Sequence, residues 1–122
     1  MKEEITAWLD YIHEQDGTPP DTVVAFNFGL FESEEGFLIY LAGAFEYTED
    51  NDDWAVLAPP TKDYRYLKLP DEIQKESQEV ILKLTKNALS ELEIEGILKM
   101  DLLKNAKAIT TGFDGGKLVK IR

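Results

Sequence analysis

The chain lacks cysteine altogether, and its first half has almost no positive charge. Without cysteine there are no disulfide bonds, zinc–thiolate sites, iron–sulfur clusters or cysteine nucleophiles, and this composition suits a reducing compartment. The longest apolar runs fall well short of the roughly 20 residues that span a bilayer, and the first residues lack the apolar region of a signal peptide. We therefore expect a cytoplasmic protein with no membrane partner.

Lysine and arginine are missing between Glu3 and Thr61, although this stretch carries fourteen aspartates and glutamates. The first 61 residues have a net charge of −13, from 14 acids and Lys2, and the last 61 have a net charge of +2, from 10 acids and 12 bases. A field of this size repels nucleic acid and attracts cationic proteins, and it accelerates association about 10- to 1,000-fold when it is focused on one face. We expect one contiguous acidic patch and no nucleic-acid partner.

Length and composition predict one α+β domain over residues 1–122, with a packed core. Apolar periodicity and turn residues predict a mostly antiparallel sheet of about five to six strands, with an N-terminal helix and a long helix packed on it. The expected elements are a helix over 2–15, strands over 23–31, 37–47, 54–59 and 64–69, a long helix from 71 to about 92, a loop with one helical turn over 93–104, and strands over 108–113 and 118–121.

Two short motifs set boundaries in this prediction. Asp71 and Gln74 have the spacing of a capping box, which predicts that the long helix begins there. Asp114, Gly115 and Gly116 separate the last two strand-like runs, and Asp-Gly tolerates the positive φ angles of a tight hairpin turn.

The segment 46–54 contains five carboxylates and an asparagine, and oxygen ligands of this kind are the ones that hard cations prefer. An EF-hand loop that starts at Asp50 needs an acidic or amide residue at Trp54, glycine at Ala55 and glutamate at Thr61, and it has none of them. A looser calcium or magnesium site, a solvated loop and a recognition loop for a cationic partner remain as interpretations. In the third, Trp54 is an apolar anchor within a charged rim.

No pattern in the sequence indicates a catalytic site or a cofactor. His13 is the single histidine, and no serine lies in the context of an activated nucleophile. The segment 112–117 is glycine-rich but lacks the spacing of a phosphate-binding loop, so we expect no nucleotide cofactor. Acid–base catalysis needs two carboxylates at a set separation. The candidates for such a pair are Glu32, Glu34, Glu35 and Glu46.

The order of motifs resembles a known family. An acidic loop ends in Asp52-Asp53-Trp54-Ala55, a proline and the capped long helix follow, and the run 109–118 reads Ile-Thr-Thr-Gly-Phe-Asp-Gly-Gly-Lys-Leu. This arrangement resembles small bacterial immunity proteins of polymorphic and contact-dependent toxin systems over most of the chain. Lys117 departs from it, since another acidic or polar turn residue is expected there. The resemblance implies a cytosolic, non-enzymatic protein that binds and neutralises one toxin domain, often a cationic nuclease.

The leading hypothesis is therefore an acidic binding protein with a cationic protein partner, no cofactor and no metal. Two alternatives remain open: a regulatory or scaffold domain whose acidity serves solubility, and an enzyme based on a carboxylate pair or a divalent cation. The expected partner-binding residues are Glu46, Glu49, Asp50, Asp52, Asp53, Trp54 and Asp114.

Overall fold

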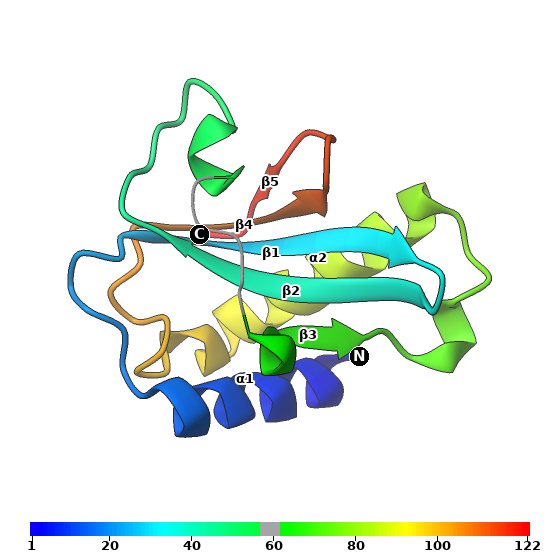
Figure 1. The fold of residues 1–122 in the computed structure, drawn as a ribbon, viewed down its shortest axis with the longest axis horizontal. Coiled ribbons are helices and arrows are strands. Elements are labelled where there is room, and N and C mark those ends of the chain that lie inside the picture. The colour runs from blue at the N-terminus through cyan, green and yellow to red at the C-terminus, as the bar shows by residue number, and fades with distance from the viewer. Residues whose placement is uncertain (57–61) are drawn as a thin grey trace.

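The protein folds as an α+β domain in which two helices pack on one face of an open sheet (Figure 1). The computed structural model describes residues 1–56 and 62–122. The helices are α1 (Lys2–Asp16) and α2 (Gln78–Ile94), and the strands are β1 (Ala25–Ser33), β2 (Gly36–Ala44), β3 (Tyr66–Lys68), β4 (Ala108–Phe113) and β5 (Val119–Lys120). The described residues also form four short 3-10 helices: η1 (Asp53–Val56), η2 (Asp63–Arg65), η3 (Asp71–Ile73) and η4 (Ile97–Lys99).

The sheet has the strand order β3-β2-β1-β4-β5. Every neighbouring pair is antiparallel except β1 and β4, which run parallel in the centre with Ala25 opposite Ala108. The expected class, a mostly antiparallel sheet with an N-terminal helix and a longer helix, is confirmed. In the described part of the chain, no helix combines the length and the apolar character needed to cross a membrane.

The two faces of the sheet differ because successive strand residues point to opposite sides. On β1, Phe26, Phe28 and Leu30 face the helices and belong to the main core. That core also takes one face of each helix, including Leu9 of α1 and Leu89 of α2. The main core is thus a single layer between helices and sheet.

The opposite face of the sheet carries small residues at one end and aromatic residues at the other. Ala25, Ala44 and Ala108 lie under Trp54 in a separate small cluster. Further along, the rings of Phe31, Tyr40 and Tyr66 pack with centroid separations of 5.8–6.2 Å. This second face is where the candidate site lies.

Tyr40 covers Gly29, its direct partner on the neighbouring strand. A Cβ atom at Gly29 would overlap the Tyr40 ring, so Gly29→Ala must expel a ring that also contacts Phe31 and Tyr66. We expect Gly29→Ala to lower the free energy of unfolding by about 1–2 kcal/mol, as overpacking does. Urea denaturation measures this change.

Tyr40→Ala provides the background that isolates this clash. Without the ring, Gly29→Ala is expected to be neutral or to stabilise the protein by up to about 1 kcal/mol, because alanine loses less backbone entropy than glycine on folding. An equal destabilisation in both backgrounds would contradict the packing explanation.

The prediction that the long helix starts at Asp71 is wrong. Residues 71–73 form only the 3-10 turn η3, and α2 begins at Gln78 with Ser77 as its N-cap, whose hydroxyl accepts the Val80 N–H at 3.3 Å. The Gln74 side chain does not turn back to Asp71. It reaches β2 instead, where it accepts the Phe37 N–H at 2.7 Å and donates to the carbonyls of Phe37 and Leu69.

The strand predicted from Trp54 does not form at its described end. Trp54 lies in η1, which the polar residues before it initiate: the Asp53 N–H donates to Asn51 Oδ1 at 3.0 Å and the Ala55 N–H to the Asp52 carbonyl at 3.2 Å. The predicted end of this strand, at Pro59 and Pro60, lies outside the described residues. The other strand predictions differ from the structure by up to three residues at each end.

Arg122 holds the segment that follows α2. Its guanidinium pairs with both oxygens of Glu93 at 2.6 and 2.8 Å. It also donates to the carbonyls of Leu98, Leu103 and Ala106 at 2.8, 2.8 and 3.3 Å. Five hydrogen bonds from one side chain thus join the end of the chain to α2 and to the irregular segment 97–106.

Candidate functional site

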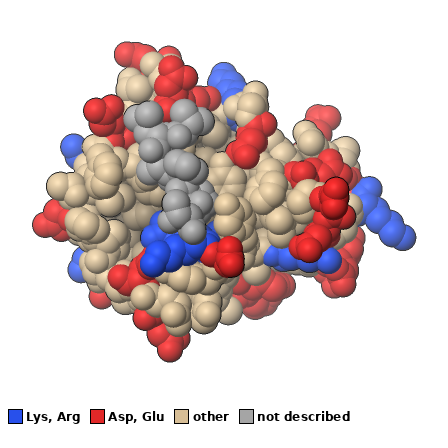
Figure 2. Space-filling model, in the orientation of Figure 1, with Lys and Arg blue, Asp and Glu red and all other residues tan. Residues whose placement is uncertain are grey.

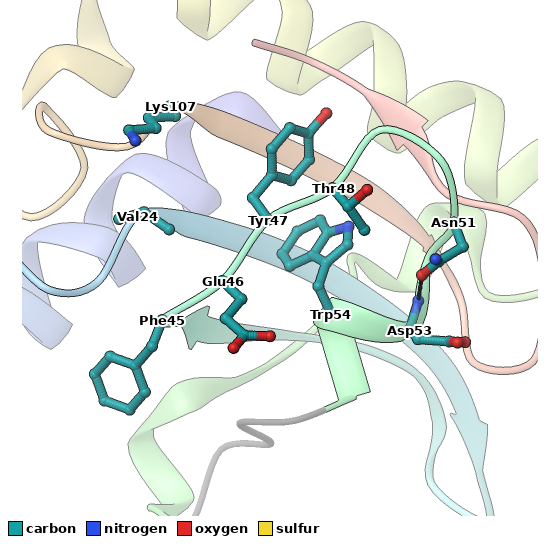
Figure 3. Close-up of a pocket in the computed structure, with 9 residues that line it drawn as sticks. All are labelled: Val24, Phe45, Glu46, Tyr47, Thr48, Asn51, Asp53, Trp54 and Lys107. Atoms are coloured by element: carbon teal, nitrogen blue, oxygen red, sulfur yellow. Dashed lines mark hydrogen bonds between the residues drawn. The ribbon is translucent and has the colours of Figure 1, made fainter.

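The segment after β2 folds over the second face of the sheet and encloses a hollow of about 610 Å³, which we call the loop pocket (Figure 3). Its wall combines aromatic rings with charged groups of both signs. The residues that line it include Phe45, Glu46, Tyr47, Asp53, Trp54 and Lys107.

Trp54 forms the inner wall of the loop pocket. Its side chain is only 4% exposed, and its ring meets Tyr47 edge-on at a centroid distance of 5.2 Å. Phe45, by contrast, is 67% exposed, and Figure 3 shows its ring pointing away from Tyr47 and Trp54. Trp54 therefore shapes the pocket from inside, and Phe45 is the aromatic residue available to a partner.

The acidic loop is held in place by polar contacts of its own. Thr48 Oγ1 accepts the Asp50 N–H at 3.2 Å, and Asp52 Oδ2 accepts the Leu118 N–H at 3.0 Å. Glu49 pairs with Lys120 on β5 at 2.9 Å, a hydrogen bond that lowers the pKa of Glu49 and raises that of Lys120. The loop carboxylates are consequently presented in defined positions beside β5.

A second hollow of about 210 Å³, which we call the turn pocket, lies between η1 and the turn that joins β4 to β5. It brings Asp52 and Asp53 together with Asp114, although Asp114 is about 60 residues further along the chain. The Tyr40 hydroxyl donates to Asp114 Oδ1 at 2.5 Å. Burial, followed by this contact with Asp114, raises the pKa of Tyr40.

The predicted partner-binding residues thus fall into three groups. Glu46, Asp53 and Trp54 line the loop pocket, and Asp52, Asp53 and Asp114 line the turn pocket. Glu49 and Asp50 lie on the same loop but line neither pocket. All six of the predicted carboxylates are exposed. Asp53 belongs to both pockets, so the two hollows adjoin at this residue.

Sequence reasoning missed Phe45, Lys107, Asn27 and Tyr40. An aromatic residue directly before an acidic segment was a usable signal for Phe45. Of the other three, Asn27 lies on β1, Tyr40 lies on β2 and Lys107 directly precedes β4, and only the pairing of these strands brings them to the site.

The expectation of one contiguous acidic patch is wrong. The acids of the first half lie on α1, at Asp21 between α1 and β1, near the β1–β2 turn and in the loop after β2, and Figure 2 shows acidic groups spread around the rim of the visible face. The nine residues of β2 separate the turn acids from the loop acids by about 26 Å at ~3.3 Å per residue. Helix α1 and the β1–β2 turn each expose their own acidic side chains to solvent, so the acids are distributed over separate parts of the surface.

The carboxylates proposed for catalysis do not form one group. Glu32, Glu34 and Glu35 lie at the β1–β2 turn, whereas Glu46 lies beyond the opposite end of β2. His13 is 3.4 Å from the Thr18 hydroxyl. Within residues 1–56 and 62–122, no three His, Cys, Asp or Glu side chains lie close enough together to hold a metal ion.

Comparisons of the chain with protein-family models, with curated proteins and with solved structures gave no match. The function of this chain must therefore be inferred from the two pockets and from the charges around them.

Proposed function

We propose that this chain is a non-enzymatic acidic protein that binds a cationic protein partner, specifically a toxin domain, and neutralises it by occupying its working surface. The docking surface is the acidic loop with its two pockets. The exposed ring of Phe45 provides apolar contact area at its edge.

The observation that supports this proposal most is the shortage of internal counter-charges. Of the 14 acids in the first 61 residues, three form an ion pair within the described part of the chain: Glu4 with the N-terminus, Asp16 with Arg65 and Glu49 with Lys120. The other eleven have no ion pair among the described residues, although Asp52 accepts the Leu118 N–H. Uncompensated carboxylates repel one another in the folded state, and a positively charged surface would relieve that repulsion.

The alternative of a scaffold that pairs through a sheet edge has less support. The edge strands β3 and β5 have three and two residues. Strand addition depends on a row of main-chain hydrogen bonds along an exposed edge. Short edge strands are also a common means of preventing such pairing.

The first test is genomic. A toxin-neutralising protein is expected to be encoded beside a large secreted protein with a toxin domain at its C-terminus. A gene that stands alone or inside a metabolic operon would contradict the toxin part of the proposal.

The second test measures association of this chain with that toxin domain by stopped-flow fluorescence. We expect the triple variant Glu46→Gln, Asp50→Asn and Asp53→Asn to slow association about tenfold at low salt, because these acids steer the encounter and have no ion pair in the described structure. The effect should shrink as added salt screens the charges. The variant spares Glu49 and Asp52, which hold the loop to β5 and Leu118.

A matched control is Glu3→Gln with Asp10→Asn and Glu14→Gln, which removes the same charge from exposed positions of α1, on the other face of the sheet. It should slow association by no more than about threefold, because the sheet lies between α1 and the acidic loop and salt screens charges beyond the Debye length of about 10 Å at 0.1 M. Equal slowing by both variants would show that net charge, and not the loop, governs the encounter. Wild-type association of the loop variant would contradict the assignment of the docking surface.

A further inference from the structure

A third hollow, of about 190 Å³, lies where the chain turns from the end of α1 toward β1, a region that can be followed in Figure 1. Its rim includes the connection over residues 17–20 and the side chain of Arg65. Four side chains of the main core, each at most 5% exposed, form its floor: Ile12, Phe26, Leu41 and Leu102. This hollow, which we call the core pocket, therefore extends from the surface into the main core.

The walls of the core pocket are mostly apolar. Pro19, Pro20 and the half-buried Val23 continue the apolar lining from the floor toward the surface. Thr18 is the single uncharged polar side chain among the described residues of the lining, and its hydroxyl lies 3.4 Å from the ring of His13. Such a lining makes van der Waals contacts with an apolar molecule but replaces few of the hydrogen bonds that a polar molecule makes with water.

The two charged side chains in the lining of the core pocket compensate each other. Arg65 forms an ion pair with Asp16, and its Nε–H donates to Asp16 Oδ2 at 3.1 Å. The Tyr64 hydroxyl donates to the other oxygen of Asp16, so both carboxylate oxygens already accept hydrogen bonds. The rim thus carries no net charge from this pair, and charge complementarity favours an uncharged ligand.

We infer that the core pocket binds a small, uncharged, apolar ring compound. A cavity of about 150 Å³ lined by leucine, isoleucine and phenylalanine binds benzene. The core pocket, at about 190 Å³, suits a single ring or a fused pair of rings the size of indole. The occupant is a free molecule and not a side chain of the toxin domain, because the floor belongs to the core on the helix side of the sheet and the acidic loop lies on the opposite face. Binding at this pocket does not depend on the proposed function.

The test titrates indole into the whole ¹³C-labelled chain and follows its methyl groups by nuclear magnetic resonance. Saturable shifts are expected for the methyl groups of Ile12, Val23, Leu41 and Leu102, with a dissociation constant of about 1 mM or less. Nuclear Overhauser effects should connect the indole protons to the same methyl groups. Uracil, a polar ring of similar size, should cause no saturable shift, because the apolar walls cannot replace its hydrogen bonds to water. Shifts that do not saturate with indole, or equal shifts with uracil, would overturn the inference.

Val23→Phe is expected to weaken indole binding about tenfold or more, because the added ring takes up volume that the ligand needs. Val24→Phe is the matched control: Val24 is also half-buried, but it lines the loop pocket, so indole affinity should stay within about twofold of the unaltered protein. Unaltered affinity in Val23→Phe, or an equal loss in both variants, would overturn the inference. The Overhauser effects need neither variant, so their absence in the unaltered protein overturns it even if Val23→Phe fails to fold.

Discussion

Replacing Arg122 with alanine is expected to lower the free energy of unfolding by about 3 kcal/mol, the largest effect of any single surface substitution considered for this fold. Both members of the Arg122–Glu93 pair are only 19% exposed, so the substitution leaves a poorly solvated carboxylate without its counter-ion. The carbonyls of Leu98, Leu103 and Ala106 lose a donor at the same time. A loss of this size should lower the melting temperature by roughly 10 °C.

Arg122→Lys should recover less than half of the lost stability, because an ammonium cannot make the two parallel bonds to Glu93 and also reach three carbonyls. Lys104→Ala is the matched control. It breaks an exposed pair with Asp101 and should change stability by less than about 0.5 kcal/mol. Similar losses of stability for Arg122→Ala and Lys104→Ala would show that the Arg122 contacts stabilise the fold no more than an exposed ion pair does.

The same pair predicts a dependence on pH. The hydrogen bond from Arg122 lowers the pKa of Glu93 below its ordinary value of 4.5. A carboxyl group whose pKa is lower in the folded state binds its proton more readily when unfolded, so it stabilises the fold above pH 4.5 and this contribution disappears as the pH falls through the folded pKa. Urea denaturation between pH 7 and 3 should therefore show a smaller loss of stability in Arg122→Ala than in the unaltered protein. Parallel pH profiles for the two proteins would contradict this.

Gln74→Ala is expected to lower the free energy of unfolding by about 2–3 kcal/mol. The reason is that the Gln74 side-chain amide makes hydrogen bonds to the backbone at the start of β2, as a neighbouring strand would. It satisfies the N–H and the carbonyl of Phe37, a core residue that is 4% exposed, and also the carbonyl of Leu69. Without it, the Phe37 N–H and the Leu69 carbonyl lose the Gln74 side chain as partner at the point where the chain leaves β3 for α2, and the Phe37 carbonyl keeps only the Leu69 N–H at 3.1 Å. Thermal and urea denaturation measure the loss.

Gly36→Ala offers an internal check on this role of Gln74. Gly36 has a φ of 113° and a Cβ atom there would overlap the Gln74 side-chain oxygen, so the substitution should displace the amide in addition to straining the backbone. The two substitutions should therefore be less than additive when combined. Strict additivity would show that Gln74 stabilises the fold by another route. Gln78→Ala, at the exposed start of α2, should be nearly neutral.

Sequence patterns correctly predicted the helix and the hairpin whose conformations depend on residues close together in the chain. The spacing of Ile5, Trp8, Leu9 and Ile12 predicted α1 to within one residue, and all four are buried. The Asp-Gly pair at Asp114 correctly predicted a hairpin between the last two strands, although of the two residues only Gly115 has a positive φ, of 80°. In these cases the helix period or the turn conformation already determines the structure.

The wrong and missing predictions involve contacts between distant residues. A capping box at Asp71 and Gln74 is locally sound, but Phe37 competes for the same amide from 37 residues away. Trp54 has a strand-like sequence context, yet the small residues of the second sheet face give its ring a better place to pack. The candidate site shows the same limit: its acidic loop was visible in the sequence, whereas the pairing of Asp114 with Tyr40, 74 residues apart, was not.

The parallel pairing of β1 with β4 has a consequence for biosynthesis. β1 lies in the centre of the sheet, and one of its two neighbours is made about 80 residues later, so the apolar side of the β1–β2 hairpin stays without its full cover while most of the chain is translated. Contacts of such long sequence separation slow folding, because the intervening chain must be ordered first. We expect nascent chains that stop before Ala108 to remain sensitive to proteases and to need chaperones. Resistance should appear only once Phe113 has left the ribosome.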